Sequence, residues 1–402
     1  MASTSTKTST GIAAGFHSEV QNRDLICTQG FINGKWIDAH SKAHFSVTDP
    51  ATDEEIARVA DMGKEETQDA IHAALEAQRS WRKTTPLVRS NLLKKWYAAI
   101  CDNADDLAVI ASAESGKPLP EAKGEVAYAA GFIDYYAHEI MHSAGFVVPP
   151  GAPGQQLIAV KEPVGIGETL STSKDVRKLS FTGSTRVGKI LMQQSAENVK
   201  RLSLELGGNA PFIVFEDADV DAAVDGLVAS KFRNTGQTCV CTNRVFVHSS
   251  IYQEFSDKLT AKVKNLKMGR PRSPGIQLGP LISQAAFQKT SDLVDDAVSK
   301  GAKALTGGKK SELGSNFYEA TVLSDVDHTM RVSQEEIFGP IAPLFSFSSE
   351  EEVVAKANST EAGLAGYFYT RDMSRAWRVA KELECGMIGV NTGLISNVQA
   401  PF

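Results

Sequence analysis

Beyond Leu157 the chain alternates short apolar runs with segments of helical periodicity, and this alternation constrains the fold more than any other feature. Runs rich in β-branched and aromatic residues favour strands, whereas apolar residues spaced three and four apart favour helices. The predicted order is strand 178–182, helix 185–197, strand 211–215 and helix 219–230, with further strands near Val245, Leu305 and Phe368. This order predicts an α/β protein with a parallel sheet of the dinucleotide-binding type.

The preceding part of the chain is dominated by helical patterns. Residues 32–38, with Gly34 at a turn, are predicted to form short β structure. Helices are expected over 64–82, 86–116 and about 120–142. A Pro- and Gly-rich loop follows at 149–154. At 402 residues the chain is long enough for two or three domains of roughly 150 residues each.

Cys239 ends a polar, glycine-bearing stretch, 232–239, that precedes a strand-like run. A cysteine kept for packing normally lies within an apolar run. A nucleophilic cysteine needs partial exposure and hydrogen-bond donors that favour the thiolate, and a loop of this composition supplies both. We therefore predict a nucleophile at Cys239 rather than an inert loop cysteine. Cys241 is expected to be a bystander, with a disulfide to Cys239 under oxidation as the lesser alternative.

A second unusual run, 204–211, places one carboxylate, Glu205, between apolar residues and glycines. Removal from water raises the pKa of a carboxylic acid, which suits it to act as a general base near neutral pH. The alternative is a carboxylate at the end of a strand or helix that takes part in a salt bridge. Gly207 and Gly208 favour the catalytic interpretation, because they indicate backbone that passes close to something bound.

Five segments together carry a resemblance to a known family. They are 181–185, 204–211, 236–239, 336–340 and 391–397. The first four resemble the motifs of the aldehyde dehydrogenase superfamily in order and spacing, and the likeness runs from about Phe31 to the last residue. The fifth, together with Arg233, is most similar to succinate-semialdehyde dehydrogenases. The resemblance implies an aldehyde dehydrogenase-like α/β fold, with a parallel-sheet dinucleotide-binding domain that lacks strands and an α/β catalytic domain.

The resemblance also implies roles for individual residues. Cys239 would attack the aldehyde carbon and pass through a thiohemiacetal and a thioester, and Glu205 would activate the water that hydrolyses the thioester. NAD or NADP is the implied cofactor. Its implied binding residues are Gly183, Ser184, Thr185, Gly188, Leu206, Gly207, Glu336 and Phe338. For Glu336 and Phe338, which resemble residues at the nicotinamide ribose and ring, a buried turn is the alternative.

Arg233, six residues before Cys239, is suited to bidentate capture of a substrate carboxylate. Ser396 would assist by hydrogen bonding. For both residues a plain surface role is the alternative. With the resemblance, they imply oxidation of a small-molecule aldehyde, succinic semialdehyde, to succinate, as in 4-aminobutyrate breakdown. Another aldehyde is the alternative within this class.

Residues 183–189 offer an interpretation from a different class, because they match a phosphate-binding P-loop up to Lys189. Ile190 stands where such a loop needs Ser or Thr to bind Mg²⁺, so a nucleoside triphosphatase is disfavoured. No metal site is expected either. Cys239 and Cys241 lack the ligand spacing of a zinc site.

The chain departs from the family at one internal position. In the family, the counterpart of Gly165 leads into a strand, a loop with the active-site Asn, and a strand that ends in the Lys that contacts the cofactor ribose. Here Gly165 is joined directly to Ile166, whose counterpart lies well downstream in relatives. At roughly thirty residues for each βαβ unit, about sixty residues are missing. The relatives' second carboxylate-binding Arg belongs to the same segment.

These differences lead to a hypothesis about activity. The missing Asn donates to the oxyanion, and loss of one such donor costs about 10²–10³ in rate. Loss of two interior strands would leave unpaired sheet edges and uncovered apolar faces. The chain is therefore expected to fold poorly or to bind the cofactor weakly. A non-catalytic homologue that associates with full-length subunits is the alternative function.

The patterns predict four segments along the chain. They are a flexible N-terminal tail, 1–25, a cofactor-binding domain, 26–206, interrupted at 165/166, a catalytic domain, 207–390, and the start of a truncated C-terminal segment, 391–402. Relatives assemble as dimers or tetramers through a strand-bearing arm and the C-terminal tail. Because that tail is shortened, a homo-oligomer is doubtful for this chain.

Charge and composition exclude several partners. The net charge of −6 offers no basic surface for nucleic acid, and no apolar run approaches the length that a bilayer span requires. Five cysteines, scattered and odd in number, favour free thiols in a reducing compartment. The first sixteen residues contain Lys7 but no Arg, which favours a cytoplasmic protein over one with a mitochondrial presequence.

Overall fold

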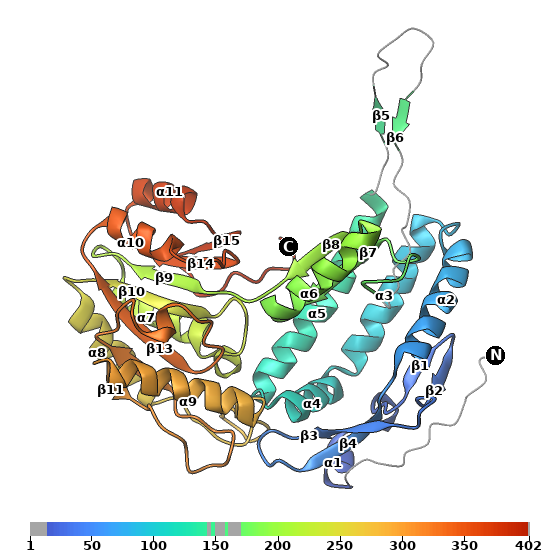
Figure 1. Cartoon of the computed structure of the whole chain (residues 1–402), viewed down its shortest axis with the longest axis horizontal. Helices are drawn as coiled ribbons and strands as arrows, with labels where there is room; N and C mark the ends of the chain where they lie inside the picture. Colours follow the sequence, from blue (N-terminus) through green and yellow to red (C-terminus); the bar gives the residue numbers. More distant parts are fainter. Residues whose placement is uncertain (1–13, 143–145, 149–156, 160–169, 401–402) are drawn as a thin grey trace.

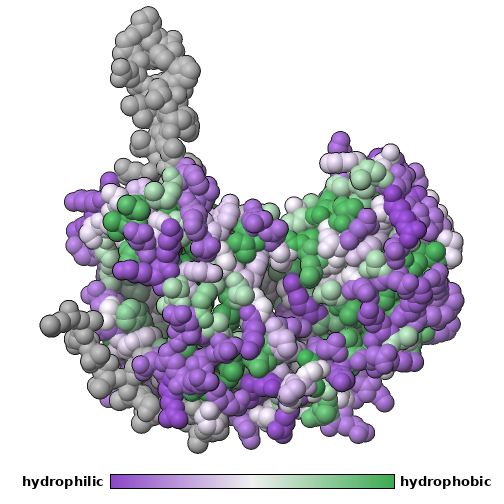
Figure 2. Space-filling view, turned by 180° about the vertical axis from the view of Figure 1, so that it is seen from behind, coloured by the Kyte–Doolittle hydropathy of each residue, from purple (hydrophilic) through white to green (hydrophobic). Residues whose placement is uncertain are grey.

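The computed structural model describes residues 14–142, 146–148, 157–159 and 170–400, and the predicted junction at 165/166 lies outside them. The chain forms two lobes that are joined at their base (Figure 1). Seen from behind, a notch separates the lobes, and hydrophobic surface lies on both sides of it (Figure 2). No helix in these described ranges is long and apolar enough to cross a membrane.

The first lobe is built mainly from helices. Its elements are α1 (Ala14–Glu19), η1 (Arg23–Leu25), β1 (Gly30–Ile32), β2 (Lys35–Ile37), β3 (His44–Thr48), β4 (Glu55–Ala60), α2 (Lys64–Trp81), α3 (Pro86–Asp102), α4 (Ala104–Ser115), α5 (Leu119–Glu139), η2 (Ile140–His142), β5 (Phe146–Val148), β6 (Leu157–Ala159), β7 (Lys178–Thr182), α6 (Thr185–Ser195), η3 (Ala196–Asn198) and β8 (Arg201–Glu205). The strands β5 and β6 pair antiparallel and project away from both lobes (Figure 1).

The single helix predicted over 86–116 is wrong, because the chain breaks at Asn103. This residue has φ −115° and ψ 17°, so it ends α3 and begins α4. Its side-chain Nδ2 donates to the carbonyl of Ala99, and its Oδ1 accepts from the side chain of Asn22. Asparagine side chains compete with the helical hydrogen bonds in this way. The predicted end of the pattern is confirmed, since Gly116 adopts a left-handed conformation after α4.

In the described part of the chain, the first lobe keeps only two parallel strands of a dinucleotide-binding sheet. These are β7 and β8, which pair in register from Lys178 opposite Arg201 to Thr182 opposite Glu205. The helix α6 begins three residues after β7, as the strand–turn–helix pattern predicts. A two-stranded pair without flanking strands agrees with the expectation that interior strands are missing.

The second lobe is a seven-stranded sheet covered by helices on both faces. Its strands are β9 (Ala210–Val214), β10 (Thr242–His248), β11 (Lys303–Thr306), β12 (Thr321–Ser324), β13 (Ile341–Phe347), β14 (Ala365–Tyr369) and β15 (Met387–Val390), in the spatial order β11-β12-β13-β10-β9-β14-β15. Apart from the β11–β12 pair, every pairing is parallel. The predicted parallel α/β sheet is therefore confirmed.

The two faces of this sheet form two hydrophobic clusters. Residues of α7 (Val220–Lys231) and α8 (Tyr252–Lys264) pack on one face, and residues of α9 (Gln284–Ser299), α10 (Glu350–Asn358) and α11 (Met373–Glu382) pack on the other. Every residue of β9 is buried, which explains its uninterrupted apolar sequence. A strand covered on both faces needs an apolar side chain at each position rather than at alternate ones.

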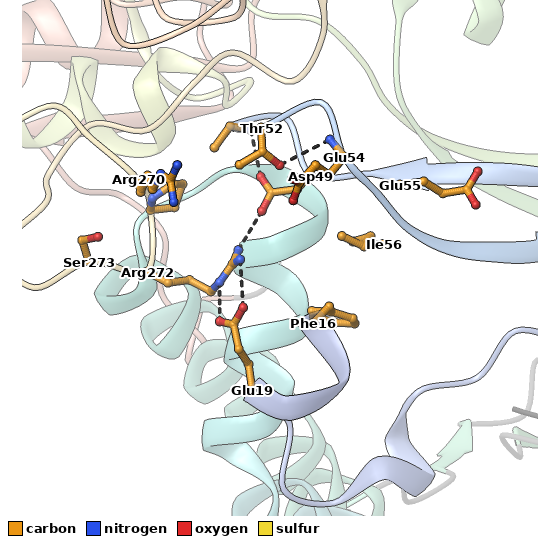
Figure 3. A pocket seen from close by; sticks show the side chains of 12 residues that line it. Phe16, Glu19, Asp49, Thr52, Glu54, Glu55, Ile56, Arg270, Arg272 and Ser273 are labelled. Atoms are coloured by element: carbon orange, nitrogen blue, oxygen red, sulfur yellow. Dashed lines mark hydrogen bonds and ion pairs between the residues drawn. The ribbon is translucent and has the colours of Figure 1, made fainter. Parts of the chain in front are cut away.

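The N-terminal segment, predicted as a tail over 1–25, is described from residue 14 onward. Within its described part, Phe16 of α1 and Val20, which follows the helix, pack on the first lobe and are 6% and 2% exposed. Arg272, from the second lobe, forms ion pairs with Glu19 of α1 and with Asp49, beside a cavity of about 370 Å³ (Figure 3). These contacts tie the segment to both lobes.

A matched pair of glycine substitutions tests the packing of α7. A Cβ on Gly226 would overlap the buried Tyr369 hydroxyl, whereas a Cβ on Gly124 in α5 would meet nothing within 4 Å. We expect Gly226→Ala to lower the free energy of unfolding by about 1–3 kcal/mol. Gly124→Ala should raise it by about 0.5–1 kcal/mol, as at an ordinary helical position. Urea titration followed by circular dichroism measures both changes, and a gain from Gly226→Ala would contradict this packing.

Candidate active site

A left-handed turn connects α7 to the segment that carries Cys239. The 3-10 turn η4 (Arg233–Gly236) contains three successive residues with positive φ, namely Asn234 at 48°, Thr235 at 55° and Gly236 at 79°. Such a conformation costs about 1–3 kcal/mol for each non-glycine residue, so it persists only where neighbouring groups hold it. Glu121 Oε2 accepts the Asn234 N–H at 2.7 Å, and the Thr235 hydroxyl donates to a carbonyl.

Glycines bring three of the sequence motifs into backbone contact. A Cβ on Gly236 would overlap the carbonyl oxygen of Gly339, and a Cβ on Gly208 would overlap the carbonyl oxygen of Cys239. The turn before Cys239, the loop after β8 and the 336–340 segment therefore meet at one place. No side chain larger than hydrogen fits at either contact without moving backbone.

Cys239 lies half-buried on a turn between η4 and β10, so the predicted partial exposure is confirmed. Burial raises the pKa of the Cys239 thiol, and the Glu336 carboxylate raises it further. The backbone N–H groups of Cys239 and Val240 lower this pKa by less. The expectation that the loop favours the thiolate is therefore wrong for this arrangement, because desolvation outweighs the donors. Cys241 is buried beneath it, with its Sγ 3.8 Å from the carbonyl oxygen of Arg233.

The Glu336 carboxylate lies at the junction of the motifs. Its Oε1 accepts the Gly208 N–H at 2.8 Å, and its backbone carbonyl accepts from Lys289 Nζ at 2.6 Å. Two residues on, Phe338 has φ 53°, and its side chain is 38% exposed. An exposed aromatic residue held in a left-handed conformation favours contact with a ligand over the alternative of a buried turn.

The strand–turn–helix motif is anchored to β8 and the loop that follows it. The Gly183 N–H donates to the Glu205 carbonyl at 3.0 Å, and Ser184 begins α6 by accepting a hydrogen bond from the Val187 N–H at 3.4 Å. The first backbone N–H groups of a helix are unpaired and carry partial positive charge, which suits them to a phosphate. The predicted position of Ser184 at a helix N-terminus is therefore confirmed.

Two further contacts bring α6 next to the loop after Glu205. Thr185 Oγ1 accepts the Gly207 N–H at 3.3 Å. A Cβ on Gly188 would come within 2.5 Å of the Leu206 side chain, so helix and loop pack closely at that position. Gly207 lies between Thr185 and the Glu336 carboxylate, since its added Cβ would be 3.3 Å and 2.8 Å from them. Thr185, Gly207 and Glu336, three of the residues predicted to bind the cofactor, thus lie next to one another.

The surface that these residues form fits the nicotinamide and pyrophosphate parts of a dinucleotide. The α6 N-terminus would hold phosphate, and the Glu336 carboxylate would accept hydrogen bonds from ribose hydroxyls. The adenosine part has less support, because β7 pairs only with β8 among the described strands. A ligand at this surface would lie beside the Cys239 backbone, which is where a hydride acceptor is needed.

Glu205 occupies the last position of β8 and is half-buried. Among the described residues, its carboxylate forms no hydrogen bond and no ion pair within 4 Å. The alternative of a salt-bridged carboxylate is therefore disfavoured. The backbone of the next three residues leads directly to the contact between Gly208 and the Cys239 carbonyl. Its role as a general base stays a prediction.

The two residues predicted to bind a carboxylate come from different segments. Arg233 is half-buried at the start of η4. Its positive charge acts to lower the pKa of the Glu121 carboxyl and of the Tyr367 hydroxyl. Ser396 is exposed in the loop after β15. The preceding residue, Ile395, packs beside Tyr367 over Gly389. Tyr367 therefore links the surroundings of Arg233 to the segment that carries Ser396.

Two charged residues near the site, one buried and one half-buried, were not identified from the sequence. Lys231, the last residue of α7, is 1% exposed, and Cys241 and Glu336 are the charged partners that raise its pKa. Burial has the larger effect and lowers the pKa of the Lys231 ammonium to about 8. Glu121 lies on α5, 113 residues from its hydrogen-bond partner Asn234. The only sequence signal for Lys231 is its position within an apolar helical run, and Glu121 has no comparable signal.

The two described cavities lie away from this constellation. The cavity of about 370 Å³ surrounds Arg272 in the contact between the lobes (Figure 3). The other, of about 540 Å³, opens on the second lobe beside Arg244 and Tyr252. Neither is lined by Cys239, Glu205 or Arg233. The chemistry of the motifs, rather than cavity volume, therefore identifies the candidate active site.

Comparison with known sequences agrees with these motifs. The sequence profile of the Aldehyde dehydrogenase family matches residues 36–167 and 166–402, which together are most of the chain. The chain belongs to the aldehyde dehydrogenase family. It is thus an oxidoreductase of the NAD(P)-dependent aldehyde dehydrogenase type.

Three similar proteins illustrate the range of relatives. A glutarate-semialdehyde dehydrogenase of Pseudomonas putida is 44% identical over 96% of this chain and 94% of its own length. A 3-sulfolactaldehyde dehydrogenase of the same species is 42% identical over 96% and 93%. The crystal structure of succinate-semialdehyde dehydrogenase from Burkholderia pseudomallei superimposes with a TM-score of 0.93 at 46% identity, over 96% of this chain and 94% of the other. The aldehyde dehydrogenase-like fold is therefore confirmed.

The comparisons also locate the missing segment. The family profile matches in two parts that meet at residues 166 and 167, next to the predicted junction. The alignment to the glutarate-semialdehyde dehydrogenase spans 451 positions but contains 96% of the 402 residues, which is about 386. About 65 aligned positions therefore have no residue in this chain. This agrees with the roughly sixty residues expected to be missing.

The burial of Lys231 predicts a pH dependence of stability. Its folded pKa of about 8 lies below the ordinary value of 10.5, so burying the ammonium destabilises the fold at neutral pH. Between these two values the unfolded chain binds a proton that the folded chain lacks, so stability rises with pH. Lys231→Met should raise the free energy of unfolding by about 2 kcal/mol at pH 7, and this gain should fade towards pH 10. Denaturation at several pH values measures it, and a loss at pH 7 would contradict it.

The proximity of Glu336 predicts a change in thiol reactivity. Because its carboxylate raises the pKa of Cys239, Glu336→Gln should lower that pKa while keeping an acceptor for the Gly208 N–H. We expect the iodoacetamide alkylation of Cys239 at pH 7 to accelerate a few-fold, roughly in line with the loss of one nearby charge. Glu335→Gln, which removes a neighbouring charge paired with Arg331, is the control. Equal effects of both substitutions would exclude a specific Glu336 contribution.

Proposed function

We propose that this chain oxidises succinic semialdehyde to succinate, with NAD⁺ or NADP⁺, in 4-aminobutyrate breakdown. The observation that carries the proposal is the position of Arg233 on the same left-handed turn that leads to Cys239. Its guanidinium forms no hydrogen bond and no ion pair within 4 Å among the described residues. A guanidinium without such partners, beside a candidate nucleophile, is suited to bind a carboxylate at the far end of a short aldehyde.

The names of the similar proteins support an anionic substrate. They refer to the semialdehydes of glutarate and succinate and to 3-sulfolactaldehyde. Each of these aldehydes carries a carboxylate or sulfonate in addition to the aldehyde group. A positively charged residue near the nucleophile, such as Arg233 in this chain, is suited to bind an anionic group of this kind. We propose the four-carbon semialdehyde because the 391–397 segment and Arg233 resemble enzymes with that substrate.

In the proposed reaction, Cys239 loses its proton, and its sulfur bonds to the aldehyde carbon to give a thiohemiacetal. A bound NAD⁺ or NADP⁺ would supply the acceptor for the hydride of that carbon. The resulting thioester remains on Cys239. Glu205 removes a proton from water, whose oxygen attacks the thioester and releases the carboxylic acid and the thiol. Because burial raises the pKa of Cys239, the first deprotonation is the step that the site must assist.

A cytoplasmic location and free thiols fit this proposal. Among the described residues, no cysteine forms a disulfide, and Cys239 is only half-buried. A reducing compartment keeps such a thiol available for catalysis. Neither a mitochondrial location nor a homo-oligomer is part of this proposal.

A second candidate function is that of a non-catalytic homologue that associates with complete subunits. The observation that favours it is the gap of about 65 aligned positions together with the two-stranded β7–β8 pair. The residues that would complete the adenosine part of the cofactor site, and the family's oxyanion donor, fall in that gap. Weak cofactor binding follows from their loss, even though Cys239 and Glu205 are present.

The proposed function predicts selective effects of Arg233 substitution. Arg233→Ala should lower kcat/KM for succinic semialdehyde about 10- to 100-fold, because a charge-assisted hydrogen bond to the substrate is lost. The value for butanal, an uncharged aldehyde of the same length, should change by less than about twofold. Steady-state reduction of NAD⁺ and of NADP⁺ measures both substrates, and circular dichroism establishes that the variant is folded.

Two outcomes would contradict the proposal in different ways. Equal losses with both aldehydes would show that Arg233 does not bind the carboxylate. Absence of turnover by the folded wild-type chain with either cofactor would favour the non-catalytic homologue. Co-purification with a complete aldehyde dehydrogenase subunit would then support that second function.

A further inference from the structure

Glu121 contributes a half-buried carboxylate to the active-site turn from a distant helix. Its Oε2 accepts the Asn234 N–H at 2.7 Å, and the two residues are 113 positions apart. Asn234 is the first of the three left-handed residues before Cys239. The hydrogen bond therefore connects α5 of the first lobe to the turn that carries the candidate nucleophile. Nothing in the proposed reaction assigns a role to this carboxylate.

The charges around Glu121 connect it to Arg233. Burial raises the pKa of Glu121, whereas the Asn234 N–H, Arg233 and Lys117 lower it and Glu125 raises it. Lys117 is already paired with Glu125. No ion pair within 4 Å joins Glu121 to Arg233 among the described residues, so the two charges attract each other without a direct contact. The Arg233 guanidinium thus remains available to another anion.

We propose that Glu121 is a positioning residue that sets the preference of the site for anionic substrates. Its hydrogen bond to Asn234 holds the left-handed turn. Its negative charge weakens the electrostatic attraction between Arg233 and an incoming carboxylate. The inference rests on the proposed capture of a carboxylate by Arg233. It adds that the negative charge of Glu121, on α5, limits how strongly Arg233 binds the substrate carboxylate.

Two substitutions separate the hydrogen bond from the charge. Glu121→Gln keeps an oxygen that accepts the Asn234 N–H but removes the charge. Glu121→Ala removes both and leaves the strained turn without its partner on α5. Arg233→Gln serves as the reference for loss of the positive charge. Circular dichroism and thermal unfolding of each full-length variant establish that the turn is studied in a folded protein.

The readout is the alkylation of Cys239 by two reagents of similar size, iodoacetate and iodoacetamide. Only iodoacetate carries a carboxylate, so the ratio of the two rate constants reports attraction of an anion towards the thiol. Neither cofactor nor turnover is required. Tandem mass spectrometry distinguishes Cys239 from Cys241, which lies on the same tryptic peptide.

Glu121→Gln should raise the iodoacetate-to-iodoacetamide ratio about three- to tenfold, the effect of removing one negative charge several ångströms from the site. Arg233→Gln should lower the ratio. In the wild-type chain the ratio should rise as the pH falls and Glu121 becomes protonated, and this rise should be smaller in Glu121→Gln, which keeps the Glu336 carboxylate beside Cys239. Glu121→Ala should increase both rate constants and lower the unfolding temperature relative to Glu121→Gln, because the turn loosens.

Each part of the inference can be overturned separately. An unchanged ratio in Glu121→Gln would exclude the competition with substrate for Arg233. Identical behaviour of Glu121→Gln and Glu121→Ala would exclude a role for the hydrogen bond in holding the turn. Failure of the proposed function would appear instead as a folded chain that turns over no aldehyde, while the ratios still report on Glu121.

Discussion

The close approach of backbone to backbone around Cys239 is the constraint on which the active-site arrangement depends. Gly208 lies against the Cys239 carbonyl, and Gly236 lies against the Gly339 carbonyl, at separations that exclude a Cβ. Three segments far apart in the sequence are thereby held in contact by their main chains rather than by side chains. The side chains of Cys239 and Glu336 project from this framework, so their relative positions follow from glycine placement.

Charged side chains that are partly or fully removed from water surround Cys239 and alter the pKa values of the site. Lys231 and Glu121 approach the turn from α7 and α5, and the carboxylate of Glu336 lies beside Cys239. The thiol pKa is raised because burial and the carboxylate outweigh two backbone donors. Burial and the neighbouring carboxylate thus both favour the thiol over the thiolate at this position. Such charges destabilise the fold, which is a common cost of functional sites.

Much of the fold follows from local sequence patterns, whereas the missed features depend on contacts across the chain. The strand 178–182 and the helix that begins at Lys64 are confirmed, because each has a clear period and clear end signals. The break at Asn103 was missed, since its hydrogen bond to Asn22 is not visible in the helical pattern. Lys231 and Glu121 were not predicted as residues of the site for the same reason, because their partners lie on other segments.

The two lobes differ in how complete their sheets are, and this difference divides the proposed chemistry. Cys239 and Arg233 belong to the lobe whose seven-stranded sheet is covered on both faces, so the proposed nucleophile and the proposed carboxylate-binding residue stand on a complete sheet. Ser184 follows β7 and Glu205 ends β8, and this pair has no further strand beside it in the described ranges. The proposed attack on an aldehyde therefore depends on the lobe with the seven-stranded sheet. The proposed hydride removal and hydrolysis depend on the lobe that has only the two-stranded pair. Whether the chain acts as an enzyme or as an inactive homologue therefore depends on how firmly the contacts of α6, Gly207 and Glu336 hold the first lobe against the turn that carries Cys239.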